Sequence, residues 1–124
     1  MNIVLPIIKM WSDLIFKGQK KYELRKKLPE GVTKIYVYES RGSGKVIGEL
    51  KIKALHHLPL DDLWNLVKDG ACVEEEFFRE YYEGKEEGVA VEIESATLYP
   101  EPLPLSSFSL TAPPQNYCII KSGN

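Results

Sequence analysis

A short basic segment carries the residue types best suited to polar chemistry. In the sequence from Gly18 to Arg25, Lys20 follows a glycine turn, and Glu23 and Arg25 share one face of a predicted strand. These three side chains can form a surface ion-pair network of little energetic weight. They can instead hold a polar ligand, with Arg25 offering a planar fork to a phosphate or a base edge. If Lys20 is partly desolvated, its pKa falls and it can accept a proton or activate a nucleophile. The residues alone leave these three interpretations open.

The charge of the chain is unevenly distributed. The net charge is −2 over 124 residues, yet Lys17–Lys27 contains six lysine or arginine residues and a single acid. The remainder of the chain is therefore acidic, which argues against broad attraction to nucleic acid. A local basic stripe can still contact a few phosphates or one nucleotide, and a solvated basic strand is the alternative.

Other candidate motifs predict ordinary structure. His56 and His57 are neighbours that point to opposite faces of a strand, so no metal site is expected, and no cofactor. The loop Arg41–Lys45 lacks the Ser or Thr that must follow the lysine of a phosphate-binding loop, so it is predicted to be a glycine-rich hairpin turn. The two cysteines, Cys72 and Cys118, are expected to be reduced core residues.

Four aromatic residues lie at helical spacing in the second half of the chain, and we predict that they belong to the core and not to a stacking surface. They are Phe77, Phe78, Tyr81 and Tyr82.

The elements that must position these residues follow from the hydrophobic periodicity. The first strand contains Pro6, which places it at a sheet edge. His56–Pro59 is expected to break the strand before it, and Pro100–Pro104 is expected to be an extended link. Strands are predicted at Ile3–Ile8, Lys21–Lys27, Lys34–Glu39, Val46–Ala54, Gly88–Leu98 and Gln115–Lys121, with helices at Met10–Lys17, Asp61–Lys68 and Glu74–Glu83 and a helical turn at Leu105–Phe108.

This pattern predicts an α+β fold, a small β-barrel of five or six mainly antiparallel strands with about three short helices. No composition shift marks a linker, so residues 1–124 are expected to form a single domain. No apolar run approaches the length needed to cross a bilayer, and the first strand lacks a basic leader, so a cytoplasmic protein is expected.

The segment Gly18–Arg25 resembles the G-x-K-x-x-E-x-R signature of the ASCH family, which belongs to the PUA-like superfamily. Gly18, Lys20, Glu23 and Arg25 make the match. The order of the flanking strands and the closing segment Pro113–Cys118 are similar to those of a small single-domain ASCH subgroup.

The resemblance implies a PUA-like β-barrel with a cleft beside it that binds RNA, a nucleotide or a nucleoside, with a role in translation- or transcription-linked regulation. Lys20, Glu23 and Arg25 would line the cleft. Tyr38, Ser40 and Arg41 would reach it from the next strand. The expected nucleic-acid-binding set is Lys20, Lys21, Glu23, Arg25, Ser40 and Arg41.

Some ASCH relatives are enzymes, so an amidohydrolase acting on a modified nucleoside such as acetylcytidine is the alternative. Lys20 matches the lysine of such an enzyme, but Glu23 replaces its threonine. Lys20 and Glu23 would then be the catalytic residues, with a further acid expected near Asp61 or Asp62. A third interpretation is a regulatory domain whose basic stripe contacts an acidic protein.

Overall fold

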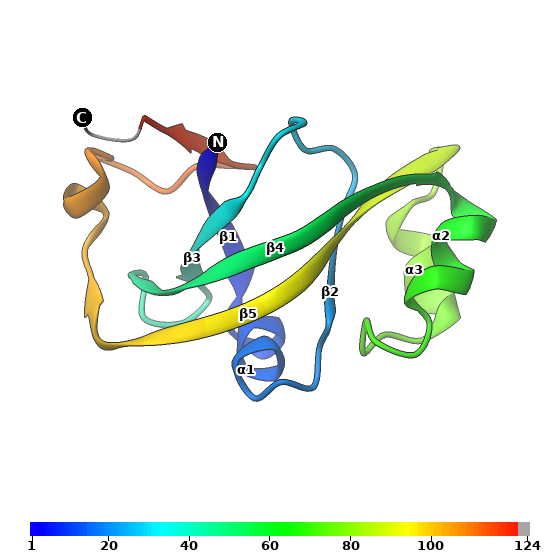
Figure 1. The fold of residues 1–124 in the computed structure, drawn as a ribbon, viewed down its shortest axis with the longest axis horizontal. Coiled ribbons are helices and arrows are strands. Elements are labelled where there is room, and N and C mark those ends of the chain that lie inside the picture. The colour runs from blue at the N-terminus through cyan, green and yellow to red at the C-terminus, as the bar shows by residue number, and fades with distance from the viewer. Residues whose placement is uncertain (122–124) are drawn as a thin grey trace.

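The computed structural model describes residues 1–121 (Figure 1). Six strands, three α-helices and one 3-10 helix follow one another along the chain. Their bounds are β1 Asn2–Ile8, α1 Lys9–Phe16, β2 Tyr22–Arg25, β3 Lys34–Ser40, β4 Val46–Pro59, α2 Leu60–Val67, α3 Glu75–Tyr81, β5 Glu87–Leu103, η1 Leu105–Phe108 and β6 Cys118–Ile120.

The strands form one mixed sheet in the order β2-β5-β4-β3-β1-β6. Only the β1–β3 pair is parallel, and the other four pairs are antiparallel. This confirms the predicted α+β class with mainly antiparallel strands. In the described residues β2 and β6 are the two edges, so no strand pairing closes the sheet into a complete barrel.

A long antiparallel pair of strands, β4 and β5, dominates the molecule, and α2 and α3 lie in the connection between them (Figure 1). Two predicted strand ends are wrong here, because β4 continues through His56–Pro59 and β5 continues through Pro100 to Leu103. The first extension is held by pairing with β5, from His56 opposite Ala90 to Pro59 opposite Glu87. At the other end of β5, few residues after Leu98 pair with β4. Proline residues are tolerated there because no hydrogen bond to a neighbouring strand is lost when a proline lacks its N–H.

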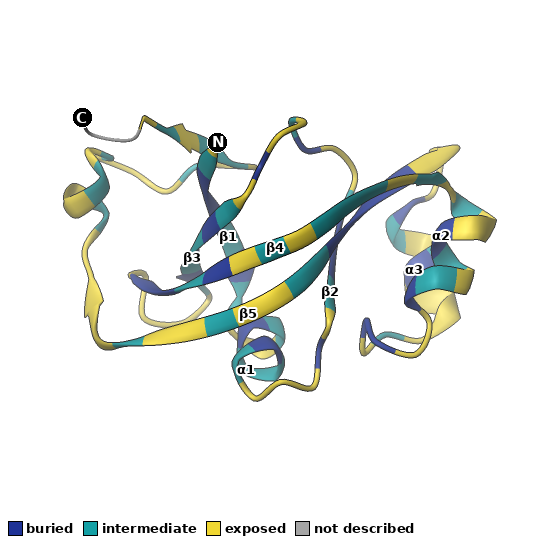
Figure 2. Ribbon diagram, viewed as in Figure 1, coloured by how far each residue is buried: buried dark blue, intermediate teal, exposed yellow. Residues whose placement is uncertain are grey.

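The hydrophobic core consists of two clusters. The larger lies between the sheet and α1, and the smaller lies under α2 and α3 (Figure 2). β5 contributes to both clusters, with Val89 and Val91 in the larger and Ala90 in the smaller. The long pair of β4 and β5 therefore packs against α2 and α3 at one end and contributes to the main core along the rest of its length.

The placement of Pro6 differs from the prediction. β1 is not an edge strand, because it lies between β3 and β6. However, β6 pairs only with Asn2–Val4, so one side of β1 is already free of a partner strand at Pro6. A proline is tolerated there because its missing N–H faces no partner strand.

The cysteines are not core residues, contrary to prediction. Cys72 is exposed in the segment between α2 and α3, with a φ of 60°. Cys118 is half-buried on the short edge strand β6.

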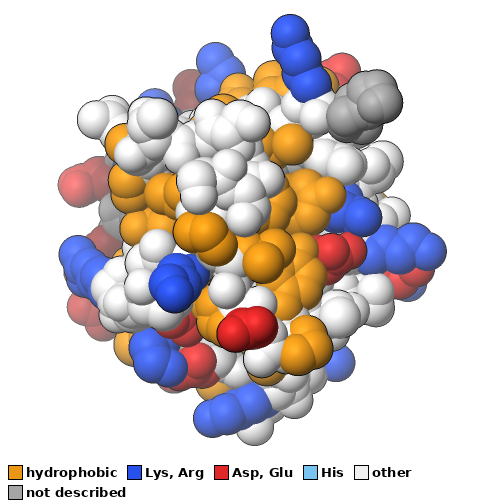
Figure 3. Space-filling view, turned by 90° about the vertical axis from the view of Figure 1, so that its left-hand side faces the viewer, with side chains coloured by type: hydrophobic (Ala, Val, Ile, Leu, Met, Phe, Trp, Pro, Cys, Tyr) orange, Lys and Arg blue, Asp and Glu red, His pale blue; other side chains and the backbone are white. Residues whose placement is uncertain are grey.

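The end of the molecule that lies opposite α2 and α3 presents an apolar surface. Figure 3 shows hydrophobic side chains gathered at the centre of this face, with charged side chains around them. Leu98 and Leu103, at the far end of β5, are among the exposed apolar residues.

Within residues 1–121, none of the helices has both the length and the apolar character required to cross a membrane.

Candidate functional site

A cavity of about 390 Å³ lies beside β2, where β1, α1 and α3 approach that strand. Its lining combines charged, polar and aromatic side chains. The residues that the argument uses are Trp11, Lys20, Glu23, Arg25, Ser40, Phe77, Tyr81 and Gln115.

The end of α1 directs Lys20 into this cavity. Gly18 adopts a φ of 78°, which favours glycine, and its N–H donates to the carbonyl of Ile15 at 2.9 Å. The N–H of Lys20 then donates to the carbonyl of Leu14 at 3.1 Å. The chain therefore turns back over the helix end and enters β2 with Lys20 facing inward. The predicted glycine cap is the feature that makes this turn possible.

Lys20 is buried, with 3% of its surface exposed. Its Nζ donates to the carbonyl oxygen of Ala71 at 2.5 Å and lies 3.9 Å from Oε1 of Glu23. The same ammonium lies 4.9 Å from the centre of the Trp11 ring. Burial lowers the pKa of Lys20, and the Glu23 carboxylate opposes this shift. The structure thus places a desolvated lysine beside a carboxylate.

Arg25 fixes the Glu23 carboxylate. Oε2 of Glu23 accepts from Nη2 of Arg25 at 2.6 Å and from Nε at 3.2 Å. Nη2 also donates to the carbonyl of Pro6 at 2.7 Å, on the side of β1 that has no neighbouring strand. Within residues 1–121, Nη1 of Arg25 has no hydrogen-bond partner, so it can donate to a ligand.

α3 and the segment before it hold the free edge of β2. The N–H groups of Lys21 and Tyr22 donate to the carbonyl of Gly70 at 2.6 and 3.2 Å. The buried hydroxyl of Tyr82 lies 3.0 Å from the carbonyl oxygen of Arg25 and 3.3 Å from that of Val89. Burial raises the pKa of Tyr82, which keeps this hydroxyl a donor. The strand that carries the motif is therefore anchored on both sides.

The aromatic cluster of α3 divides between the core and the cavity, so its predicted assignment to the core is only partly correct. Phe78 and Tyr82 are fully buried, as predicted. Phe77 and Tyr81 instead line the cavity, and Phe77 is 44% exposed. Successive helical positions differ in direction by about 100°. The two aromatic pairs therefore cannot share one face of the helix.

The predicted site residues separate into two groups. Lys20, Glu23, Arg25 and Ser40 line the same cavity. Lys21 lies on the other side of β2, against a different hollow. Arg41 is exposed in the turn between β3 and β4 with a φ of 53° and is not part of the cavity lining.

Sequence reasoning missed Trp11 and Gln115. Trp11 lies on α1, and its helical spacing gives no sign that the ring faces a cavity. Gln115 lies in the C-terminal segment, which reaches the cavity because β6 pairs with β1. No local motif marks either residue.

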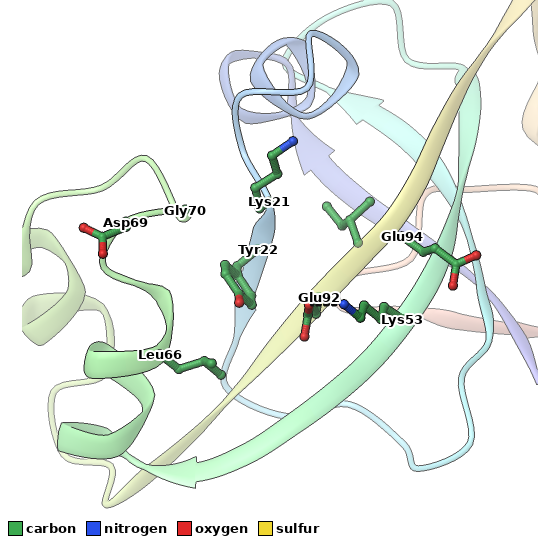
Figure 4. Close-up of a pocket in the computed structure, with 9 residues that line it drawn as sticks. Lys21, Tyr22, Lys53, Leu66, Asp69, Gly70, Glu92 and Glu94 are labelled. Atoms are coloured by element: carbon green, nitrogen blue, oxygen red, sulfur yellow. Dashed lines mark ion pairs between the residues drawn. The ribbon is translucent and has the colours of Figure 1, made fainter.

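The larger hollow against Lys21 has a volume of about 660 Å³ (Figure 4). On its β4–β5 side, Lys53 from β4 and Glu92 from β5 form an ion pair at 3.5 Å. His56 also contacts the Glu92 carboxylate, at 2.8 Å, and this hydrogen bond lowers the pKa of Glu92. Two of the charged groups that line this hollow, Lys53 and Glu92, therefore already pair with each other.

The acid expected near Asp61 or Asp62 does not lie in the cavity lining. Both residues are exposed on α2, and Asp61 pairs with Arg79 at 2.7 Å. In the described part of the chain, no cluster of three His, Cys, Asp or Glu side chains is placed to hold a metal ion. The charged groups available to a ligand in the cavity are those of the motif itself.

Comparisons with known proteins relate this geometry to a family. No family model matches the chain. An ASCH domain-containing ribonuclease of Zymomonas mobilis is 28% identical over 89 residues, which cover 68% of this chain and 60% of that protein. A ribosomal protein, uL22 of the large subunit of Ureaplasma parvum, is 24% identical over 90 residues, or 73% of this chain and 29% of that one. The chain thus spans less than two thirds of the curated relatives it matches.

Solved structures give the same fold. A crystal structure of the ASCH protein of Zymomonas mobilis covers 97% of this chain and 87% of its own, with a TM-score of 0.86 and 23% identity. A tyrosine-to-phenylalanine variant of that protein gives a TM-score of 0.86 at 22% identity, covering 97% of this chain and 90% of its own. The chain thus has the fold of the ASCH protein of Zymomonas mobilis, and part of its sequence is similar to that of an ASCH domain-containing ribonuclease.

Proposed function

We propose that this domain binds RNA by taking one nucleotide into the cavity beside β2. The observation that carries the proposal is the buried cluster of Lys20, Glu23 and Arg25 in a cavity with aromatic walls. The curated relative that is named a ribonuclease supports RNA as the class of partner.

The cluster is rich in hydrogen-bond donors. Oε2 of Glu23 already accepts from Arg25, so a ligand meets Nη1 of Arg25, the remaining N–H groups of the Lys20 ammonium and a single carboxylate oxygen, Oε1 of Glu23. Groups rich in acceptors, such as phosphate oxygens and base carbonyls, complement such donors. Ser40 and Gln115 add groups that both donate and accept.

Size and charge favour a single nucleotide over a long duplex. The cavity volume of about 390 Å³ is of the order that small-ligand pockets have. The net charge of the chain is −2, and its basic residues are concentrated near the motif. Few phosphates can then be neutralised at once.

The test is the affinity for a short labelled single-stranded RNA, measured by fluorescence anisotropy. Lys20→Met removes the charge and keeps the length of the side chain. We expect its binding to be about 10- to 100-fold weaker, the scale of a lost charged hydrogen bond. The matched control is Lys51→Met, because Lys51 is an exposed lysine whose partner is Glu94, away from the cavity.

A salt titration sharpens the test. Each neutralised phosphate of a single strand contributes about −0.7 to the slope of log affinity against log salt concentration. One or two phosphate contacts predict a slope of about −0.7 to −1.4. A much steeper slope would contradict the single-nucleotide cavity. An absence of binding at low salt would overturn RNA as the partner.

Catalysis on the bound nucleotide is the second candidate. The observation that favours it is the buried Lys20, whose pKa is lowered by desolvation and which lies beside Glu23. A neutral lysine can accept a proton, so Lys20 would act as the base and Glu23 would orient it. Hydrolysis of RNA and removal of an acetyl group from acetylcytidine are the reactions to assay. If neither product forms faster with the native protein than with Lys20→Met, this candidate is wrong.

A further inference from the structure

Three aromatic rings follow one another along the cavity wall, and we refer to Trp11, Phe77 and Tyr81 as the aromatic row. The ring centres of Trp11 and Phe77 are 5.8 Å apart. Those of Phe77 and Tyr81 are 6.3 Å apart, with their planes only 6° from parallel. α1 supplies the first ring and α3 the other two, so packing between these elements sets the row.

Trp11 and Tyr81 pack against the core on one side, but the middle ring, Phe77, belongs to neither of the hydrophobic clusters that residues 1–121 form. Phe78 and Tyr82 already provide the buried aromatic surface of α3. Phe77 is nevertheless a phenylalanine with 44% of its surface exposed, at a cavity that also contains charged groups. Because exposed aromatic surface contributes little to folding, the position of the Phe77 ring is better explained by an apolar ligand surface that covers it.

A cation lies at each end of the row. Nζ of Lys20 lies 4.9 Å from the centre of the Trp11 ring, and Nζ of Lys26 lies 5.0 Å from that of Tyr81. Sites for single-stranded nucleic acid combine these two features, because ring faces stack on bases while ammonium groups attract the phosphates between them.

From this arrangement we propose that the aromatic row stacks on unpaired bases and so restricts the RNA to single strands. The inference rests on the function proposed above and specifies the form of RNA that the same site takes. A ring can stack on a base only where the base has left its neighbours in the helix. A duplex would therefore present no base face to Trp11 or Phe77.

The experiment compares short single-stranded RNA, a duplex of the same sequence, and an abasic ribose-phosphate oligomer of the same length. Phe77→Ala is the test variant, Phe77→Tyr retains the ring, and Leu98→Ala is the control at an exposed apolar residue far from the cavity. Because Phe77 is partly exposed, its replacement leaves the core intact. Circular dichroism confirms that each variant is folded.

Stacking predicts that Phe77→Ala binds single-stranded RNA about 5- to 100-fold more weakly, the scale of base–aromatic stacking. Phe77→Tyr and Leu98→Ala should bind like the native protein. On the abasic oligomer, Phe77→Ala should cause no further loss, because the base that it would contact is absent. The native protein should bind the duplex more weakly than the single strand.

The outcomes separate this inference from the proposed function. If the native protein binds single-stranded RNA and Phe77→Ala binds it equally well, the stacking inference is wrong while RNA binding stands. Equal affinity of the native protein for duplex and single strand also overturns the inference alone. If the native protein binds none of the three ligands at low salt, both proposals are wrong.

Discussion

The ammonium group of Lys20 donates a hydrogen bond to the carbonyl oxygen of Ala71 at 2.5 Å, across 51 residues of sequence. This bond ties the start of the motif strand to the segment between α2 and α3. It also explains how a lysine is accommodated where only 3% of its surface is exposed. A buried cation needs such partners, since water no longer solvates it.

The first prediction concerns the dependence of stability on pH. Burial lowers the pKa of Lys20 below its ordinary value of 10.5 in the folded protein. Between the lowered pKa of the folded state and the ordinary pKa of the unfolded state, the unfolded chain binds more protons at this lysine than the folded chain does. The free energy of unfolding therefore increases with pH in this range. We therefore expect the unfolding free energy of the native protein, relative to that of Lys20→Met, to rise toward pH 10.5.

Urea unfolding at a series of pH values measures this difference. The same comparison with Lys51→Met is the control, because the side chain of Lys51 is 68% exposed. A native-minus-Lys20→Met difference that stays constant, or falls as the pH rises, would show that the lysine is not desolvated.

The second prediction concerns the charge of Glu23. Glu23→Gln keeps the shape of the side chain but leaves the buried Lys20 and the mostly buried Arg25 without a counter-charge. We expect the free energy of unfolding to fall by about 3 to 5 kcal/mol, because removing one partner of a buried ion pair leaves the other charge buried without a partner. Glu94→Gln is the matched control, because its pair with Lys51 is exposed, and its cost should be below about 1 kcal/mol. Equal costs for the two variants would contradict the burial of the cluster.

The third prediction concerns the anchor of the motif strand. Tyr82→Phe removes the hydroxyl that lies within hydrogen-bond distance of the carbonyls of Arg25 and Val89. We expect a loss of about 1 kcal/mol of unfolding free energy, and faster amide hydrogen exchange in β2 than in β3. Exchange followed by mass spectrometry measures both strands in one experiment. Acceleration confined to β3 would show that the hydroxyl does not support β2.

The fourth prediction concerns the two thiols. Cys72 is exposed and Cys118 is only half-buried on the edge of the sheet, so Cys72 should react first with a thiol reagent. Because Cys72 follows Ala71, whose carbonyl holds Lys20, a bulky adduct there should also weaken RNA binding. Labelling of native protein and of Cys72→Ser, read by mass spectrometry, assigns the rates. Faster labelling of Cys118 would contradict the exposure of Cys72.

The sequence was sufficient for the fold class and for the local geometry of the motif. Alternation in the second strand placed Glu23 and Arg25 on one face, and the glycine after α1 indicated the turn before Lys20. Both patterns are local, since strand periodicity and helix caps depend on residues close in the chain. The depth of the site was not accessible in this way, because Ala71 covers Lys20 from a distant segment.

Strand ends were the least predictable part of the fold. His56–Pro59 has no strand pattern of its own and remains extended because β5 runs beside it. Pro6 suggested an edge, yet the same free backbone exists inside the sheet where β6 is too short to reach. In both cases the neighbouring strand, and not the local residues, determines the conformation.

The two end rings of the aromatic row pack against different hydrophobic clusters. Trp11 packs against the larger cluster, whereas Tyr81 packs against the smaller one under α2 and α3. Local opening of the smaller cluster would therefore separate the rings while the main sheet stays folded. On heating, the cavity should therefore open before the main sheet unfolds. A ligand that contacts both Trp11 and Tyr81 would couple the two clusters, so that they unfold together.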